Sequence, residues 1–288
     1  MSRKFRLYWY NGLRNFGDQL SPVIFEYVLG CKPSYAGKWN GDGICVGSII
    51  EFATLRGDMR TSNHWFFDRL KAEFNYRLRT PLRIFGAGLM RPLSKYGSIR
   101  MRKAEVYALR GSLSLEELKR EPDIYRMMGE TSLGDPGLLL PKIYMAQREK
   151  RYKRGFVPHA YFWETDFVSD FSKEHPDVRL IDPRQDYKDV IDEIVSCEIL
   201  YSSSLHGLVM ADAYGVPNCW VIPEFPETDI SSAAFKFYDY YSAFSVHREP
   251  CRAKDIFQGK ICDPISPDIV QSQSQKIYQA IASAVSRK

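Results

Sequence analysis

Short apolar runs alternate with amphipathic stretches along most of the chain. In the first half, the apolar runs have the length and composition of strands, and they lie at 5–10, 44–50, 83–85 and 105–109. Helices are expected between and after them, over 63–78 and 115–120. Because strands that alternate with helices form parallel sheets, this order predicts an α/β fold.

Two helices are marked by their end residues. Ser21 and Pro22 are typical of a helix start, as the N-cap and the first helical residue, and Gly30 is typical of a helix end. The residues before them, 11–19, are then expected to form a loop after the first strand. For the helix at 115–120, the start is expected at one of the serines of Arg110-Gly111-Ser112-Leu113-Ser114.

The alternation starts again after residue 150. Strands are expected at 155–158, 178–182, 197–201 and 218–222, and helices at 164–173, 187–196, 208–214 and 269–285. A run dense in charge, 147–154, is placed at the junction. We predict one α/β domain over 1–150, a second over 151–265, and a terminal helix, 266–288, that packs back. Two such domains put strand ends on either side of a cleft, which suits a transferase.

The composition fits a folded protein and excludes some partners. The chain has 288 residues, of which 44% are hydrophobic and 26% charged. Its formal net charge of +5 is a mild bias, so no nucleic-acid partner is expected. The charge is compatible with an anionic substrate or with transient contact with an acidic membrane surface. For the run 147–154, a solvated linker and a surface for anionic phospholipid both stay open.

The six cysteines indicate a reducing compartment and no metal site. None form a C-x-x-C pair, no cysteine–histidine spacing is typical of zinc, and Cys45, Cys197 and Cys219 lie in apolar runs. The N-terminal residues lack the apolar core of a signal peptide, and no run approaches the length of a membrane-spanning helix. We therefore expect a cytoplasmic protein that binds no metal.

The segment 201–207 combines hydroxyls, an imidazole and a helix start. It contains Ser203, Ser204 and His206, and it lies between an apolar strand and a helical run. The free N–H groups and the dipole of a helix N-terminus favour an anion, and open α/β sheets bind ligands at their strand ends. An active site for an anionic substrate is one interpretation. A helix cap with a structural histidine is the other.

Three further groups of residues follow predicted strands. Arg110 offers a planar fork of donors for a carboxylate or phosphate, unless it is merely exposed. His159 is expected at the same sheet edge as His206, which favours acid/base chemistry over an incidental histidine. Asn15-Phe16-Gly17-Asp18 presents polar groups to the cleft, or only caps a helix and forms a turn. No complete dinucleotide or Walker motif is present.

The ordered set of these motifs resembles one family. The set consists of Asn15-x-Gly17-Asp18, Arg110-Gly111-x-x-Ser114, Gly134-Asp135-Pro136-x-x-Leu139, Val157-Pro158-His159 and Ser203-Ser204-Leu205-His206-Gly207. In this order it resembles the polysaccharide pyruvyl transferase family, and the phrase from Ser203 to Pro217 is similar to its bacterial exopolysaccharide members. The resemblance runs from about residue 5 to about residue 245.

The resemblance implies a GT-B-like arrangement of two Rossmann-like domains that face a cleft. It implies a transferase that takes phosphoenolpyruvate and a sugar residue and forms a cyclic pyruvate ketal and phosphate. No metal and no cofactor is implied, since phosphoenolpyruvate is a co-substrate. The acceptor is expected to be an oligosaccharide linked to polyprenyl diphosphate, at the inner face of the cytoplasmic membrane.

The resemblance also implies roles for individual residues. His206 and His159 would be catalytic, and Asn15, Gly17 and Asp18 would face the acceptor. Phosphoenolpyruvate would be bound by Arg110, Ser203, Ser204, Leu205 and Gly207. Some relatives carry arginine where this chain has Ser204. The helix N–H groups, or an arginine or lysine elsewhere, would then hold the anion, or the donor would differ.

Two other functions stay open at this point. A glycosyltransferase that uses a nucleotide sugar would share the two-domain architecture and the phosphate-binding helix start. A catalytically inactive relative that binds polysaccharide or lipid would keep the fold but not the reaction. His206 and Arg110 argue against an inactive relative, because both groups have a role in the implied reaction.

Overall fold

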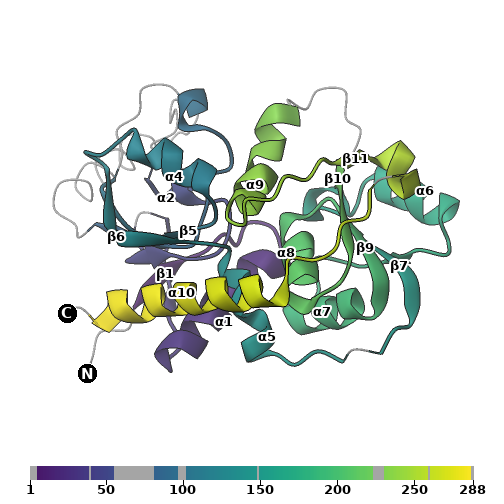
Figure 1. Ribbon diagram of the computed structural model, residues 1–288, viewed down its shortest axis with the longest axis horizontal. Coiled ribbons are helices and arrows are strands. Elements are labelled where there is room, and N and C mark those ends of the chain that lie inside the picture. The colour runs from purple at the N-terminus through teal and green to yellow at the C-terminus, as the bar shows by residue number, and fades with distance from the viewer. Residues whose placement is uncertain are drawn as a thin grey trace.

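The protein contains two parallel β-sheets that lie on either side of residue 150 (Figure 1). The computed structural model describes residues 5–38, 40–54, 81–96, 102–147, 149–222, 230–258 and 260–286. The helix expected over 63–78 lies outside these residues. The predicted α/β class is confirmed, because strands alternate with helices and every strand pair within the two sheets is parallel.

The first sheet has the order β2-β1-β3-β4-β5-β6. Its strands are β1 (Arg6–Tyr8), β2 (Ser34–Tyr35), β3 (Gly43–Ile44), β4 (Leu82–Phe85), β5 (Ala104–Leu109) and β6 (Tyr125–Leu133). Its helical segments are α1 (Phe16–Leu29), α2 (Ile50–Thr54), α4 (Ser112–Lys119) and the 3₁₀ turn η2 (Leu93–Tyr96). The chain leaves β1 for β2 on one side and returns to β3 on the other. The strand order therefore reverses between β1 and β3, which is where open α/β sheets form a crevice.

The second sheet repeats this topology, with the order β11-β10-β9-β7-β8. Its strands are β7 (Tyr152–Val157), β8 (Arg179–Leu180), β9 (Cys197–Ser202), β10 (Asn218–Ile222) and β11 (Cys251–Arg252). Its helical segments are η4 (Ala160–Phe162), α6 (Asp166–Glu174), α7 (Tyr187–Val195), α8 (Leu205–Tyr214) and η5 (Ala253–Gln258). Here the order reverses between β7 and β9. The predicted strands and helices of this half match closely, because their apolar faces are regular.

Helix α1 begins earlier than its sequence predicts. Asn15 is the N-cap, and its side-chain oxygen accepts a hydrogen bond from the backbone N–H of Gly17 at 3.2 Å. The start predicted at Ser21 and Pro22 is wrong: both lie inside the helix, and the buried Ser21 hydroxyl accepts from the Val46 N–H. The predicted end is confirmed, since Gly30 has the left-handed φ of 65°.

Other boundaries also differ from the sequence-based expectation. The strand expected over 44–50 is only β3, after which the chain turns and α2 begins at Ile50. Strand β6 was not predicted, because its side chains are mostly half-buried and follow no clean alternation. Helix α4 starts at Ser112 with Gly111 as the cap, and the Ser112 and Ser114 N–H groups bond to side chains of a distant helix.

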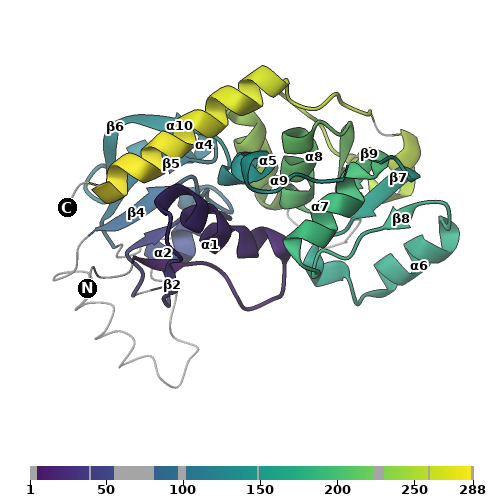
Figure 2. The ribbon, with the colours of Figure 1, turned by 90° about the horizontal axis from the view of Figure 1, so that it is seen from below.

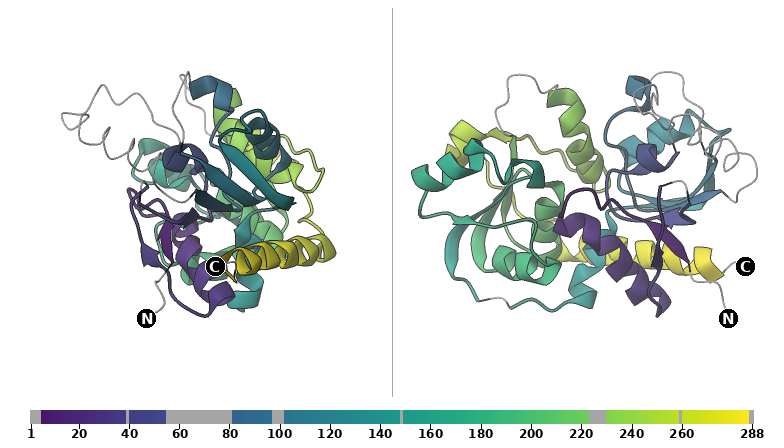
Figure 3. Two further views of the ribbon diagram at one scale, coloured as in Figure 1. Left: turned by 90° about the vertical axis from the view of Figure 1, so that its left-hand side faces the viewer. Right: turned by 180° about the vertical axis from the view of Figure 1, so that it is seen from behind.

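Segments from both halves pack together between the sheets. One continuous core includes Leu7 and Phe16 from the first half and Val157 and Leu208 from the second. At its centre, η3 (Pro136–Leu139) and α5 (Leu140–Ile143) contact α1 and α8. In the view from behind in Figure 3, α1 lies at the junction of the two lobes. The same view has α1 close to α7 of the second half, which it contacts.

The last two helices link the halves in different places. Helix α10 (Pro267–Ser286) runs back along the first sheet, where it contacts β4, β5 and β6 (Figure 2). Helix α9 (Ile230–Ser242) lies between the lobes and packs on α4 of the first half (Figure 1). Both therefore fix the second half of the chain against the first.

The charged run at 147–154 is partly built into the second sheet. Tyr152 begins β7, Arg154 forms an ion pair with Asp177 at 2.6 Å, and Lys150 donates to backbone carbonyls of residues 195 and 197. A membrane role of this run stays a prediction. Within the described ranges, no helix is both long and apolar enough to cross a bilayer.

Candidate active site

A cavity of about 290 Å³ lies between the carboxyl ends of the two sheets. Its walls come from the segments that follow β1, β3, β4, β7 and β9, with one side chain from α9. The lining residues are Tyr10, Leu13, Asn15, Asp18, Ser48, Ile49, Phe52, Met90, His159, Tyr161, Ser204, Leu205, His206 and Lys236. Both points of strand-order reversal therefore face the same cavity, which is the position expected of a ligand site in such sheets.

His206 is the second residue of α8 and is held in the cavity wall. Its side chain is 6% exposed, and its Nε2 atom is buried with no hydrogen-bond partner in the described structure. The ring lies edge-on to Phe16, with the centroids 6.3 Å apart. Buried polar atoms are normally satisfied, so an unpartnered ring nitrogen at a cavity favours a ligand or a reacting group there.

The turn that precedes His206 is fixed by Ser202. The Ser202 hydroxyl accepts from the Ser204 N–H at 3.0 Å and lies 2.8 Å from the Ser204 carbonyl oxygen. Gly207 allows this close approach, because a Cβ at that position would come 2.3 Å from Ser202 Oγ. Ser204 is the N-cap of α8, but its hydroxyl makes no capping bond. The first N–H groups of α8 and this hydroxyl are thus directed to the cavity end of the helix.

His159 lies beside His206 because β7 and β9 are neighbours, with Val157 paired to Ser202. The His159 N–H donates to the Ser203 hydroxyl at 2.9 Å, and its Nδ1 accepts from the Tyr161 N–H at 3.4 Å. The sequence prediction that both histidines occupy one sheet edge is confirmed by this pairing. Ser203 and Gly207 do not line the cavity; they shape the two turns that hold the histidines.

Both imidazoles are neutral at physiological pH in this site. Burial, followed by the positive charges of Lys236 and Arg110, lowers the pKa of His206 to about 3. Burial, Lys236 and His206 lower the pKa of His159 to about 3. A neutral imidazole presents a lone pair, so His206 is ready to accept a proton. An anion in the cavity would offset the positive charges and raise this pKa.

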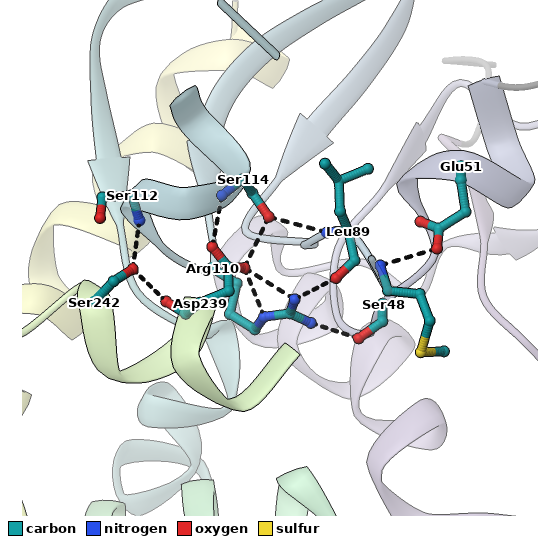
Figure 4. Close-up of polar contacts among 9 residues, drawn as sticks. Ser48, Glu51, Leu89, Arg110, Ser112, Ser114, Asp239 and Ser242 are labelled. Atoms are coloured by element: carbon teal, nitrogen blue, oxygen red, sulfur yellow. Dashed lines mark hydrogen bonds and ion pairs between the residues drawn. The ribbon is translucent and has the colours of Figure 1, made fainter. Parts of the chain in front are cut away.

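Arg110 is fully buried and is paired with Asp239 of α9 (Figure 4). Its Nε donates to Asp239 at 2.9 Å, and its terminal nitrogens donate to Ser48 Oγ at 2.5 Å and to the Leu89 carbonyl at 2.6 Å. Arg110 is absent from the cavity lining. Direct contact with an anion, as predicted from its place after β5, stays a prediction, and the structure gives its guanidinium a different set of partners.

Lys236 is the cation that lines the cavity, and the sequence analysis did not single it out. It lies on α9, one turn before Asp239. Its ammonium group lies 5.2 Å from the Phe237 ring centroid, and no ion pair joins it to a carboxylate in the part of the chain that the structure describes. Burial and then Arg110 lower its pKa to about 8, against the opposing effect of Asp18. In the sequence, Lys236 differs from its neighbours in one respect: it is a single charged residue within the apolar run 233–238.

Asn15 and Asp18 also line the cavity, at the start of α1. Burial raises the pKa of Asp18 to about 7, although Lys236 and the bond from Asn15 lower it. Gly17, the third residue of this predicted group, does not line the cavity and instead contacts the His206 ring. The cavity therefore contains one carboxyl group, one ammonium group and two neutral imidazoles.

Aromatic side chains from both halves form the mouth of the cavity. The hydroxyls of Tyr10 and Tyr161 lie 3.4 Å apart, and the Tyr10 ring stacks on Phe52 with centroids 6.5 Å apart. Phe52 is 43% exposed and Tyr161 is 63% exposed. Exposed rings grouped at a cavity are typical of a surface that receives a ligand. No group of three or more metal-ligating side chains occurs among the residues placed by the structure.

Comparisons with known proteins bear on the family of this chain. A sequence model of the polysaccharide pyruvyl transferase family matches residues 20–224. This range contains His159, Ser204 and His206, whereas Asn15, Asp18 and Lys236 lie outside it.

Two relatives give further comparisons. The succinoglycan biosynthesis protein ExoV of Rhizobium meliloti is 26% identical over 249 residues, which cover 85% of this chain and 66% of that protein. The uncharacterized protein L143 of Acanthamoeba polyphaga mimivirus is 33% identical over 149 residues, or 50% of each chain. The chain thus matches about half of the length of L143 and just under two thirds of ExoV.

Proposed function

Because the chain belongs to the polysaccharide pyruvyl transferase family, we propose that it transfers pyruvate from phosphoenolpyruvate to two hydroxyls of a sugar residue. The products are a cyclic ketal and phosphate. His206 supports this proposal best, because it lines a cavity at the N-terminus of a helix and its buried Nε2 has no hydrogen-bond partner among the described residues. The relative that is named for succinoglycan biosynthesis supports an exopolysaccharide precursor as the acceptor.

The proposed reaction moves two hydroxyl protons. The methylene carbon of phosphoenolpyruvate gains one proton, and C2 forms a bond to the first sugar oxygen. The bond between C2 and the phosphate oxygen then breaks, the second sugar oxygen closes the ring at C2, and phosphate leaves with the second proton. Neither water nor an oxidant is consumed, so the reaction balances with donor and acceptor alone.

His206 fits the proton transfers of this sequence. Its lowered pKa keeps the ring neutral in the empty site, so that its lone pair can accept the proton of the first attacking hydroxyl once the charge of the donor has raised that pKa. Arrival of an anionic donor raises that pKa, which favours the imidazolium as the acid for a later step. His159 lines the same cavity, and its pKa is also lowered. It therefore provides a second neutral imidazole for these proton transfers.

The acceptor is proposed to enter through the aromatic mouth. Sugar rings stack on aromatic side chains through their apolar faces, and Tyr10, Phe52 and Tyr161 present such surfaces. Asn15 and Asp18 follow on the first-domain side and offer hydrogen bonds to sugar hydroxyls. We extend the proposal to an oligosaccharide on polyprenyl diphosphate at the inner face of the cytoplasmic membrane. The net charge of +5 favours such an anionic carrier.

The test is phosphate release with His206→Asn. We expect turnover with phosphoenolpyruvate and crude lipid-linked oligosaccharide to fall about 10²–10⁴-fold, as for loss of a general acid/base. The control is His247→Asn, because His247 is exposed and paired with Glu249 away from the cavity. Near wild-type turnover of His206→Asn would overturn the assignment. Thermal stabilisation by a nucleotide sugar, and none by phosphoenolpyruvate, would instead favour a glycosyltransferase.

A further inference from the structure

Lys236 lines the cavity wall, and no ion pair with a carboxylate is formed within the described ranges. Asp18 acts favourably on its charge through space, while Arg110 repels it. Keeping an ammonium group charged in a partly dry site is costly unless an anion compensates it. The Lys236 side chain is therefore arranged for an anion that comes from solution.

A second part of the cavity lining also favours an anion. It consists of Ser204, Leu205 and His206, at the N-terminal turn of the ten-residue helix α8. The free N–H groups of such a turn attract negative charge. A second observation points to a ligand at the same place, because the 94% buried His206 side chain leaves Nε2 without a partner in the part of the chain that the structure describes. An anion in this cavity would therefore meet the ammonium group of Lys236 and the positive end of the α8 dipole.

We propose that Lys236 and the N-terminal turn of α8 bind the phosphate group of the donor, and that the buried Arg110–Asp239 pair positions Lys236. This inference rests on the proposed function, since it names what holds phosphoenolpyruvate. Lysine acts as a compact point charge, and phosphate is the more highly charged end of that donor. An arginine at the position of Ser204, as in some relatives, is then not needed, because Lys236 of α9 provides the positive charge.

Asp239 holds α9 against the first domain. Its carboxylate accepts from Arg110 Nε at 2.9 Å, and from the N–H and the hydroxyl of Ser114 at 2.7 and 2.8 Å (Figure 4). Helix α9 lies in close contact with Gly111, the N-cap of α4, where an added Cβ would come 1.6 Å from the Asp239 carbonyl oxygen. Asp239 is three residues after Lys236, so this anchor fixes the turn of α9 that carries the ammonium group. Arg110 is thus a positioning residue for the donor site.

The first test compares ligand affinity in Lys236→Gln and Lys173→Gln. Lys173 is an exposed residue of α6 that pairs with Asp170, so the control removes the same charge away from the cavity. Calorimetry with phosphoenolpyruvate and with inorganic phosphate should show about ten- to hundredfold weaker binding of both ligands for Lys236→Gln, as for loss of a charge-assisted contact. Pyruvate, which lacks the phosphate, should bind the wild type and Lys236→Gln alike.

The pH dependence of phosphate affinity shows whether Lys236 acts through its charge or only through its place in the structure. Wild-type affinity for phosphate should fall above about pH 8 as Lys236 loses its proton. Lys236→Arg should keep phosphate affinity through this range, because guanidinium stays charged. The other groups that face Lys236 are Arg110, Asp18 and the two histidines, and the pKa of each histidine is lowered to about 3 in the empty site. Asp18 titrates near pH 7, so the profiles are compared in an Asp18→Asn background.

The outcomes distinguish this inference from the proposed function. If Lys236→Gln binds phosphoenolpyruvate and phosphate as tightly as Lys173→Gln does, the role of Lys236 is overturned while phosphoenolpyruvate remains the donor. The same conclusion follows if Lys236→Arg loses phosphate affinity above pH 8 as the wild type does. If the wild-type protein binds neither ligand, the proposed function fails, and this inference fails with it.

Discussion

Gly17 lies against the imidazole of His206, so that a Cβ on Gly17 would come 2.0 Å from Nδ1 and 2.3 Å from Cγ. Gly17 is the second residue of α1 and His206 is the second residue of α8. The starts of two helices, one from each half of the chain, therefore meet at the candidate catalytic ring. The Asn15-x-Gly17 spacing has a packing role here, since the cap at Asn15 and the missing side chain at Gly17 together admit His206.

Gly17→Ala is expected to displace the His206 ring. The added methyl group cannot fit beside Nδ1, so either the imidazole or the start of α1 must move. Because a shift of about 1 Å at a reacting group can cost about 10²-fold, we expect kcat to fall at least tenfold. Affinity for phosphoenolpyruvate should change less, since Lys236 and Ser204 are untouched.

Gly37→Ala is the matched control, because a Cβ at Gly37 would meet nothing within 4 Å. Steady-state kinetics and calorimetry on both variants make the comparison. Unchanged kcat in Gly17→Ala would show that the position of this ring does not govern the reaction.

Asp18→Asn is expected to stabilise the protein at pH 8 more than at pH 5. Burial raises the pKa of Asp18 to about 7 in the folded state, from an ordinary value of 3.8. Between these values the folded state binds the proton and the unfolded state does not, so this carboxyl contributes stability that is lost as the pH rises through 7. Asparagine cannot acquire the charge and avoids that loss.

Thermal unfolding at the two pH values measures this effect. Asp170→Asn, at an exposed position on α6, is the control and should show no such difference between pH 5 and pH 8. Asp135, whose pKa burial raises to about 6, is present in all the proteins, so its contribution cancels. An Asp18→Asn protein whose gain in Tm is the same at both pH values would contradict the prediction.

The sequence correctly placed those cavity residues that directly follow strands. His159 and His206 directly follow strands, and parallel strands bring their carboxyl ends to one edge. The apolar runs were enough to find β7 and β9, and hence to place both rings together. Helix α1 was misplaced because Ser21-Pro22 imitates a helix start. Asn15, which caps the helix, looks the same in sequence as a turn residue.

The partners of Arg110 and the place of Lys236 could not be predicted in this way. Arg110 and Asp239 are 129 positions apart, and their contact depends on how α9 crosses from one half to the other. No periodicity within either half specifies that crossing. Lys236 lies on the same helix, whose close contact with the start of α4 leaves no room for a side chain at Gly111.

Tyr161→Ala and Phe52→Ala are expected to weaken acceptor binding. Both rings are exposed at the mouth of the cavity, and loss of a stacking contact is expected to raise the acceptor KM about three- to tenfold. The KM for phosphoenolpyruvate should stay near the wild-type value, because its phosphate is proposed to bind at Lys236 and the N-terminal turn of α8.

Tyr35→Ala is the control for these variants. Tyr35 is 46% exposed but packs on Trp9 and does not line the cavity. Tyr161→Phe separates stacking from the hydroxyl contact with Tyr10, and it should keep most of the acceptor affinity. If Tyr35→Ala raises the acceptor KM as much as Tyr161→Ala does, the aromatic mouth is not the acceptor site.

Arg110 and Asp239 are expected to be strongly coupled in stability. Each side chain is 0% exposed, so Arg110→Met leaves a buried carboxylate without its cation, at a cost of about 3–5 kcal/mol in the free energy of unfolding. In Arg110→Met/Asp239→Asn the unpaired charge is gone. The amide can still accept from the Ser114 N–H, so the double variant should be more stable than Arg110→Met alone.

Urea unfolding of the wild type, Arg110→Met, Asp239→Asn and the double variant forms a double-mutant cycle that measures the coupling of the two side chains. We expect a coupling free energy above about 1 kcal/mol, well outside the additivity of independent sites. Phosphate affinity should fall in Arg110→Met, because α9 loses its anchor, yet an alkaline loss should persist because Lys236 still provides the charge. This loss should move to higher pH, since the Arg110 charge that lowers the pKa of Lys236 is gone. Additive free energies would mean that the pair does not hold α9. Disappearance of the alkaline loss would instead indicate that Arg110 acts on the anion more directly than through α9.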